Sequence, residues 1–288
     1  GQLDEMNEPP ADAAAQRANA LDRARELLQP LLDALTEDDP DLPFALVAMA
    51  DLEALSGNLE VSRDLYIRSL ELLEDIEVYV KLGDVYLELG QHEEAREAFE
   101  SALEIDGTFA RAHLGLAHVF RAEGNIEQAL VKYEDAFEHG RNLDYLDRYA
   151  IAAEALELDP NNISMRLNFA NFLGNGNVFT AALREYNTIL EQDEGVLDAH
   201  LGMGKVHISK LQFEEAIESL RSAEGLSDSV QQDIEIYELL RQAERGIAGP
   251  GQPMLESGQE VVYQLAILYL QDGRLVDSFN MLGELSGR

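Results

Sequence analysis

The chain has 288 residues, 46% of them hydrophobic and none of them cysteine, so a sizeable core is expected while disulfides, thiolate metal sites and cysteine nucleophiles are excluded. Its 56 acidic residues outnumber 21 basic ones, and the formal net charge of -35 argues against nucleic acid or an anionic membrane surface as a partner. Membrane insertion is also not expected, because charged residues interrupt every apolar run before it reaches the roughly 18 residues of a membrane span.

The N-terminal segment predicts a tail and then a cap. Residues 1–10 (GQLDEMNEPP) are expected to form a disordered acidic tail, and residues 11–38 one or two helices, broken at Pro30, that cover the apolar end of the first repeat. No basic segment precedes an apolar one at the N-terminus, although a signal or anchor that has been removed would leave no trace. The location therefore stays open between cytoplasm and periplasm.

Within residues 39–143 the sequence repeats with a period of 34 residues. The flanks of Gly90 and Gly124 fall into step over Leu82, Gly83, Tyr86, Ala95, Phe99 and Ala102 on one side and Leu116, Ala117, Phe120, Ala129, Tyr133 and Ala136 on the other. This period predicts two antiparallel helices per unit, with small residues where the backbones approach and large ones between hairpins. Gly90 and Gly124 suit the positive φ of a tight turn. One hairpin cannot bury its apolar stripe alone, so neighbouring hairpins must stack.

The same period returns in the central repeats, residues 163–230, and more loosely at residues 259–288. Two surplus segments separate these blocks. Residues 144–162 predict one extra helix that ends at Pro160, and residues 231–258 predict another, with a loop rich in Gly and Pro after it. We expect both extra helices to be unpaired and to interrupt the array; the alternative is a degenerate repeat that stacks smoothly.

These small and large positions resemble the signature of the tetratricopeptide repeat family. The match is close at residues 76–109 and 110–143, fair at 163–196 and 197–230, and looser at 43–75 and 259–288. The resemblance implies an all-α, right-handed superhelical array of antiparallel helix hairpins, with about six repeats plus two unpaired helices. It also implies a scaffold that binds other proteins, in a macromolecular assembly or a secretion system, and not an enzyme.

In that family the concave groove lined by first helices holds a partner's peptide or helix. The repeat register assigns eight candidate residues to this groove: Lys81, Asp84, Arg111, His118, Arg121, Asn168, Asn171 and Lys205. The cations predict a neutral to basic strip inside an acidic molecule, which would attract an acidic or C-terminal segment of a partner. The asparagines can bond to the main chain of an extended peptide. The alternative is that the cations only balance acidic neighbours within the array.

One subgroup of the family binds the acidic C-termini of Hsp70 and Hsp90 chaperones through a clamp of Lys, Asn and Arg. The corresponding positions here hold Val80 and Asp84, then Gly115 or His118, then Ser164 and Asn168. The clamp does not match, so a chaperone adaptor of that kind is not predicted.

The last predicted helix, about residues 274–286, looks uncovered. It carries Leu275, Val276, Phe279, Leu282 and Leu285 with nothing polar after it, whereas repeat arrays usually need a polar cap. Either the native chain continues, or this end docks on a partner or on a second copy. Self-assembly through this helix, giving a homo-oligomer, is therefore one alternative function. A regulatory domain of a larger enzyme is another, and a helix with one face simply wet is the plainest account.

No catalytic residue, metal site or cofactor is predicted. His113 and His200 share one repeat position and His207 holds the position of Tyr86, so packing explains these histidines better than metal ligation. Gly204 and Lys205 lack the preceding glycine and the following hydroxyl residue of a phosphate-binding loop. The many carboxylates form no distinct pair suited to acid–base catalysis.

Overall fold

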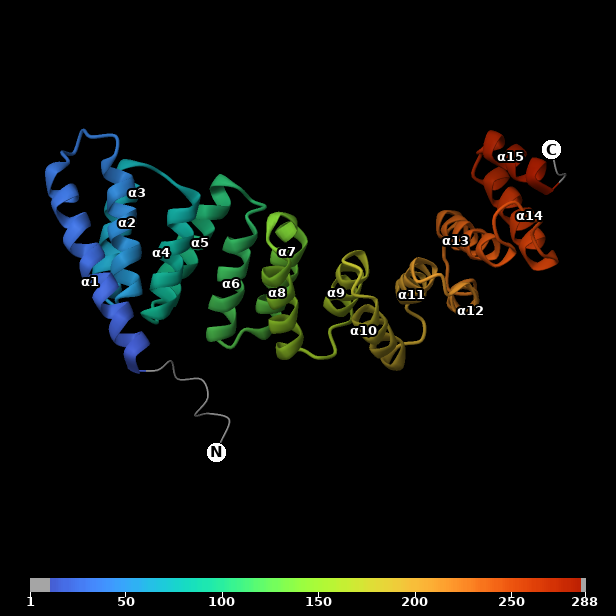
Figure 1. The fold of residues 1–288 in the computed structure, drawn as a ribbon, viewed down its shortest axis with the longest axis horizontal. Helices are drawn as coiled ribbons and strands as arrows, with labels where there is room; N and C mark the ends of the chain where they lie inside the picture. Colours follow the sequence, from blue (N-terminus) through green and yellow to red (C-terminus); the bar gives the residue numbers. More distant parts are fainter. Residues whose placement is uncertain (1–10, 286–288) are drawn as a thin grey trace, which may run out of the picture. The chain divides into compact units, whose positions relative to one another are not determined.

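The computed structural model describes residues 11–285, so the predicted tail at residues 1–10 lies outside the described residues. The described part is helical, with no strand (Figure 1). Its helices are α1 (Ala11–Ala34), α2 (Leu42–Leu55), α3 (Leu59–Leu72), α4 (Ile76–Glu88), α5 (His92–Ile105), α6 (Ala110–Ala122), α7 (Ile126–His139), α8 (Tyr145–Leu158), α9 (Ile163–Asn175), α10 (Phe179–Gln192), α11 (Leu197–Ser209), α12 (Phe213–Ala223), α13 (Val230–Ala248), α14 (Glu256–Gln271) and α15 (Leu275–Leu285).

Two compact units divide the chain, an N-terminal unit of residues 1–158 and a C-terminal unit of residues 159–288. The N-terminal unit packs α1 on the hairpins α2–α3, α4–α5 and α6–α7, with α8 on α7. The C-terminal unit contains the hairpins α9–α10, α11–α12 and α14–α15, with α13 between the last two. The predicted fold class, an all-α array of helix hairpins with two additional helices, is confirmed. None of the described helices combines the length and the apolar composition needed to cross a membrane.

Each hairpin closes on a pair of small residues twelve positions apart. Ala95 and Ala129 are fully buried, as are their counterparts in the other hairpins. Where the second-helix residue is serine, its hydroxyl also donates to the first helix, from Ser62 to the carbonyl oxygen of Ala50 at 2.8 Å. Small side chains at this point let the two helix backbones approach closely.

Large side chains then lock one hairpin to the next. Phe99 of α5 lies between two glycines, and a Cβ atom added to Gly83 or Gly115 would approach its ring to 2.6 or 2.2 Å. Tyr186 of α10 lies equally close to Gly202 of α11, at 2.3 Å from such a Cβ atom. These glycines are required by shape, because any side chain there would collide with a buried ring.

Each turn between the two helices of a hairpin contains a residue with a positive φ, the left-handed backbone region. Gly90 and Gly124 have φ of +72° and +77°, as their spacing predicts. In the C-terminal unit the turns of α9–α10 and α11–α12 use Asn177 at +61° and Leu211 at +59°, whereas the turn of α14–α15 again uses a glycine, Gly273 at +79°. A leucine in the left-handed region is strained.

The described helices differ from the expectation in two ways. α1 continues through Pro30, where a break was expected; Pro30 is exposed, so the carbonyl group that loses its partner can bond to water. The extra helix α13 also does not interrupt the stacking, because it packs on both α12 and α14, whereas α8 ends the N-terminal unit at the division between the two units, where an interruption was expected. α8 packs on α7, and α13 packs on α12 through a buried cluster that includes Leu220 and Ile236. Each therefore stands where the first helix of a following repeat would stand.

Candidate functional site

The predicted groove residues all lie on first helices, whose exposed side chains form what we call the first-helix face of each unit. In the N-terminal unit this face brings together the candidates of α4 and α6: Lys81, Asp84, Arg111, His118 and Arg121. In the C-terminal unit it holds Asn168 and Asn171 of α9 and Lys205 of α11. The eight residues thus form two separate groups, one in each unit.

A ladder of ion pairs crosses the first-helix face of the N-terminal unit. Lys81 Nζ of α4 lies 2.7 Å from a carboxylate oxygen of Asp51 in α2. Arg111 Nη1 of α6 lies 2.5 Å from Glu77 Oε2 in α4. Each pair joins one first helix to the next, about one repeat away in sequence. Both pairs are partly exposed, so each stabilises the fold by only about 0.5 kcal/mol.

The ladder ends at Glu154 of α8, which receives three partners. His118 Nε2 and Arg121 Nη1 of α6 lie 2.9 and 3.0 Å from its Oε2, and the hydroxyl of Tyr133 in α7 donates to the same oxygen at 2.9 Å. Burial alone would raise the pKa of Glu154, but these hydrogen bonds and the charges of His118 and Arg121 hold it below its ordinary value. Glu154 thereby fastens α8 to both helices of the preceding hairpin.

These contacts agree with the alternative interpretation, that the cations balance acidic neighbours. Lys81, Arg111 and Arg121 all have carboxylate partners, and in the C-terminal unit Lys205 Nζ lies 2.7 Å from Glu235 Oε1 of α13. The sequence reasoning missed those partners: Asp51, Glu77, Glu154 and Glu235. The signal that reveals them is an opposite charge about 30 to 36 residues away on the next first helix.

Asp84 is the predicted residue that stands apart in the N-terminal unit. It forms no ion pair with any described residue and lines a hollow of about 490 Å³ with Leu87, Glu88, His118 and Arg121. Although the side chain is accessible to solvent, the surrounding protein raises the pKa of its carboxyl to about 6. Loss of hydration is the main cause; Arg111 opposes the shift and Glu88 adds to it.

The C-terminal unit presents amides on this face. Asn168, Asn171 and Asn175 share one side of α9, three and four residues apart. The hydroxyl of Tyr186 donates to Asn171 Oδ1 at 2.7 Å, which orients that amide. The side chains of Asn168 and Asn175 form no hydrogen bond with the described residues. Asn171 and Asn175 line a small hollow of about 70 Å³ together with Tyr186 and Lys205.

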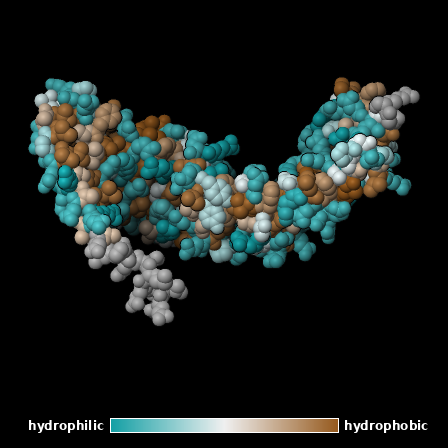
Figure 2. Space-filling view, viewed as in Figure 1, coloured by the Kyte–Doolittle hydropathy of each residue, from teal (hydrophilic) through white to brown (hydrophobic). Residues whose placement is uncertain are grey.

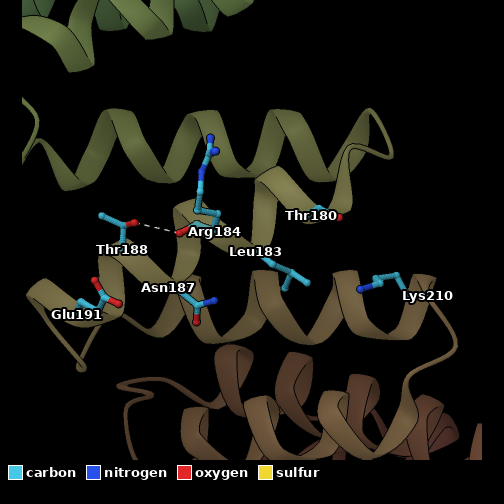
Figure 3. A pocket seen from close by; sticks show the side chains of 7 residues that line it. All are labelled: Thr180, Leu183, Arg184, Asn187, Thr188, Glu191 and Lys210. Atoms are coloured by element: carbon cyan, nitrogen blue, oxygen red, sulfur yellow. Dashed lines mark hydrogen bonds between the residues drawn. The ribbon is translucent and has the colours of Figure 1, made fainter.

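Another hollow lies away from the predicted groove, on the second helix α10 (Figure 3). Its volume is about 350 Å³, and its walls are Thr180, Leu183, Arg184, Asn187, Thr188, Glu191 and Lys210. The Thr188 hydroxyl donates to the main-chain oxygen of Arg184 at 3.0 Å. In Figure 3 the side chains of α10 spread along that helix, Lys210 comes from a separate segment, and the side chains do not converge on one point.

The two histidines that share a repeat position, His113 and His200, also share a contact. His113 is buried, and its Nε2 lies 3.0 Å from the main-chain oxygen of Gly107. His200 makes the same contact at 3.0 Å with Glu194, also six residues earlier. Two histidines in one repeat position thus make one contact with the preceding loop.

Comparison with known proteins connects these features to one family. Residues 44–107 and 86–146 match two family models described as tetratricopeptide repeat, and neither model describes a catalytic family. The chain is 24% identical over 213 residues to the TPR repeat-containing protein YpiA of Bacillus subtilis, covering 68% of this chain and 50% of that protein. It is 26% identical over 207 residues to the BBSome complex member BBS4 of Bos taurus, covering 70% of this chain and 34% of that protein.

Among solved structures, the chain resembles that of YrrB, described as a TPR protein with an unusual peptide-binding site. The identity is 22% and the TM-score 0.34, with 73% of this chain and 97% of that chain covered. The chain spans half or less of the length of the two curated relatives above.

Proposed function

We propose, from the premise that this chain is a tetratricopeptide repeat protein, that it is a scaffold whose first-helix face holds an extended segment of a partner protein. The amide row of α9 carries this proposal. The side chains of the predicted Asn168 and of the adjoining Asn175 form no hydrogen bond with the described residues. The cationic groove candidates Lys81, Arg111 and Lys205, in contrast, already have carboxylate partners. A polar side chain without an internal partner on this face is available to a ligand.

The chemistry of an amide suits the main chain of a peptide. Each asparagine offers two N–H donors and one acceptor oxygen, so it can pair with both groups of a peptide unit whatever the peptide's side chains. Along α9 the three amides rise by about 4.5 and 6 Å, comparable with the roughly 6.6 Å between alternate residues of an extended chain. The predicted grip on the main chain is therefore sterically reasonable for an extended segment.

The ion pairs change the kind of partner that we propose. In the N-terminal unit, Lys81, Arg111 and Arg121 share the face with Asp51, Glu77 and Glu154, and Asp84 and Glu88 add negative charge without a cation of their own. An acidic segment would meet net repulsion there. In the C-terminal unit, Lys205, the charged candidate of that face, already pairs with Glu235. We therefore propose a neutral or basic extended segment and set aside the acidic one.

A peptide-selection experiment tests the groove. Random peptides of 12 residues displayed on phage would be selected against the whole chain, and the affinities of the recovered peptides measured by fluorescence anisotropy. The double substitution Asn168→Ala, Asn175→Ala removes two amides that have no internal partner, so it should leave stability unchanged and weaken binding at least about tenfold, or 1.4 kcal/mol.

The matched control is Asn187→Ala, Gln192→Ala, which removes two exposed amides from α10. It should leave peptide affinity unchanged. Equal loss in both variants, or no loss in the α9 variant, would place the peptide site elsewhere on the chain.

Membership of a larger assembly is the broader form of this proposal. BBS4 is by its name a member of a complex, and the family resemblance implies the same kind of role. The assembly, its compartment and any role in secretion belong to the proposal.

A further inference from the structure

The position of α15 within its hairpin indicates which side of this helix would contact a following helix. The hydroxyl of Ser278 donates to the carbonyl oxygen of Ala266 at 2.8 Å, which repeats the bond from Ser62 to Ala50 at 2.8 Å in the first hairpin. Both pairs are twelve residues apart. α15 is therefore the second helix of a regular hairpin, and its positions can be compared one by one with those of other second helices.

In α5, the positions one, four and seven residues after the small residue face the following first helix. Arg96 pairs with Glu123 at the end of α6 and lies over the ring of Phe120 at 5.5 Å. Phe99 and Ala102 have no exposed surface and belong to the cluster that α6 completes. A following helix thus covers all three positions.

The same three positions of α15 are uncovered. Phe279, Leu282 and Leu285 are 77%, 43% and 37% exposed, and beside them Leu275 and Val276 are 67% and 74% exposed. Hydrophobic surface is visible at this end of the C-terminal unit (Figure 2). These positions correspond to the ones that a following helix covers in α5, but no helix among the described residues covers them in α15. Exposed apolar patches of this kind mark interaction sites.

We propose that this surface, distinct from the amide row of α9, binds an amphipathic helix of a partner protein in the position of a following first helix. The interface continues one that the array already builds several times. A second copy is the less suitable occupant, because two chains that each carry a formal charge of -35 repel one another.

The neighbouring helix α14 indicates the charge that the partner helix carries. Glu260 holds the position that Glu77 has in α4, eighteen residues before the small residue of the second helix. There Glu77 accepts a hydrogen bond from Arg111 of the next first helix. Glu260 is exposed, and among the described residues it accepts a hydrogen bond only from the neutral Gln264, at 2.7 Å. The partner helix is therefore expected to carry Arg or Lys in its first turn.

The size of Leu282 indicates which kind of apolar residue the partner helix carries opposite it. Phe99, in the equivalent position, leaves room only for Gly115 of the next helix. Leucine is smaller, and Leu220 in that position shares its buried cluster with Ile236. An aliphatic residue opposite Leu282 would fill the space that a glycine leaves empty.

A synthetic helix tests this site. The probe is a fluorescein-labelled peptide with the α6 sequence Ala110–Ala122 and the change Gly115→Ile, stapled on its solvent face to keep it helical. Saturable binding to the whole chain is expected. Phe279→Glu, at a position that is 77% exposed, should weaken it at least about tenfold, whereas Leu146→Glu, at a position on α8 that is 74% exposed, should not.

A charge exchange checks the orientation. The same peptide with Arg111→Glu should bind several-fold more weakly to the wild-type chain, and Glu260→Lys in the protein should restore its affinity. No binding of the probe, or binding that Phe279→Glu leaves unchanged, would overturn the proposal. So would a concentration-dependent dimer, seen by sedimentation and abolished by Phe279→Glu, because it would assign the surface to a second copy. The α9 double variant should bind the probe normally, which separates this site from the peptide groove.

Discussion

The two units share one hairpin architecture but use their first-helix faces differently. In the N-terminal unit, ion pairs connect α2 to α4, α4 to α6 and α6 to α8. In the C-terminal unit, α9 presents asparagines, and of the charged groove candidates there Lys205 pairs with Glu235. A face whose polar groups are satisfied internally contributes to cohesion, and one whose amides are free is available to a ligand. The comparison shows that repeat position alone does not determine which of the two a side chain does.

The core should behave alike in both units, and this is the largest effect we expect. Gly115→Ala and Gly202→Ala each place a Cβ atom 2.2–2.3 Å from a buried ring, and each should lower the free energy of unfolding by about 3 kcal/mol. Urea denaturation followed by circular dichroism measures the loss. Hydrogen exchange should show it in the N-terminal unit for Gly115→Ala and in the C-terminal unit for Gly202→Ala.

Gly225→Ala is the matched control, since nothing lies within 4 Å of a Cβ atom there. It should change stability by less than about 0.5 kcal/mol. A Gly115 variant as stable as this control would contradict the close packing of Phe99.

Removing a carboxylate from the ion pairs of the first-helix face should reduce stability more in the N-terminal unit than in the C-terminal unit. Glu154→Gln weakens a carboxylate that three side chains contact, so we expect a loss of about 2 kcal/mol and faster hydrogen exchange in α8. Glu235→Gln removes one exposed pair and should cost less than about 0.5 kcal/mol. Equal losses of stability in the two variants would contradict the view that the ion pairs contribute more to the N-terminal unit than to the C-terminal unit.

The stability lost in Glu154→Gln should depend on pH, in the direction that the pKa of Glu154 determines. Because the pKa of Glu154 is lowered in the fold, its stabilising contribution is present at neutral pH and is lost as pH falls below the ordinary carboxyl range. The difference between wild type and Glu154→Gln should therefore shrink in acid. A difference that stays constant from pH 7 down to pH 3 would argue against an ionised Glu154.

Replacing Asp84 should have a small effect on stability, opposite in sign to that of replacing Glu154. The fold raises the pKa of this carboxyl to about 6 from an ordinary value of 3.8, so its ionisation costs stability as pH rises through that window. Asp84→Asn should stabilise the chain at pH 8 by less than about 1 kcal/mol, because the side chain remains accessible to solvent. At pH 3 the gain should vanish. Urea denaturation at both pH values measures it, and a gain that is equal at both would refute the raised pKa.

Much of the fold can be predicted from the sequence by itself. Small residues twelve apart, large residues four further on and a period of 34 residues define the hairpins, because helices can approach only at small side chains and a single hairpin leaves its apolar stripe uncovered. The glycines at +72° and +77°, the shared position of His113 and His200 and the candidate positions on first helices result from the same register.

Other features depend on how the helices stack. The partners of Lys81, Arg111 and Arg121 lie on a neighbouring first helix, where spacing along one helix does not indicate them. The sequence therefore suggested a basic strip, whereas the structure shows ion pairs. Likewise α8 and α13 have no hairpin partner in sequence, yet each packs as a following first helix. The physical reason is the same in each case: periodicity determines which face a side chain occupies, whereas charge pairing and burial depend on what the neighbouring helix places opposite it.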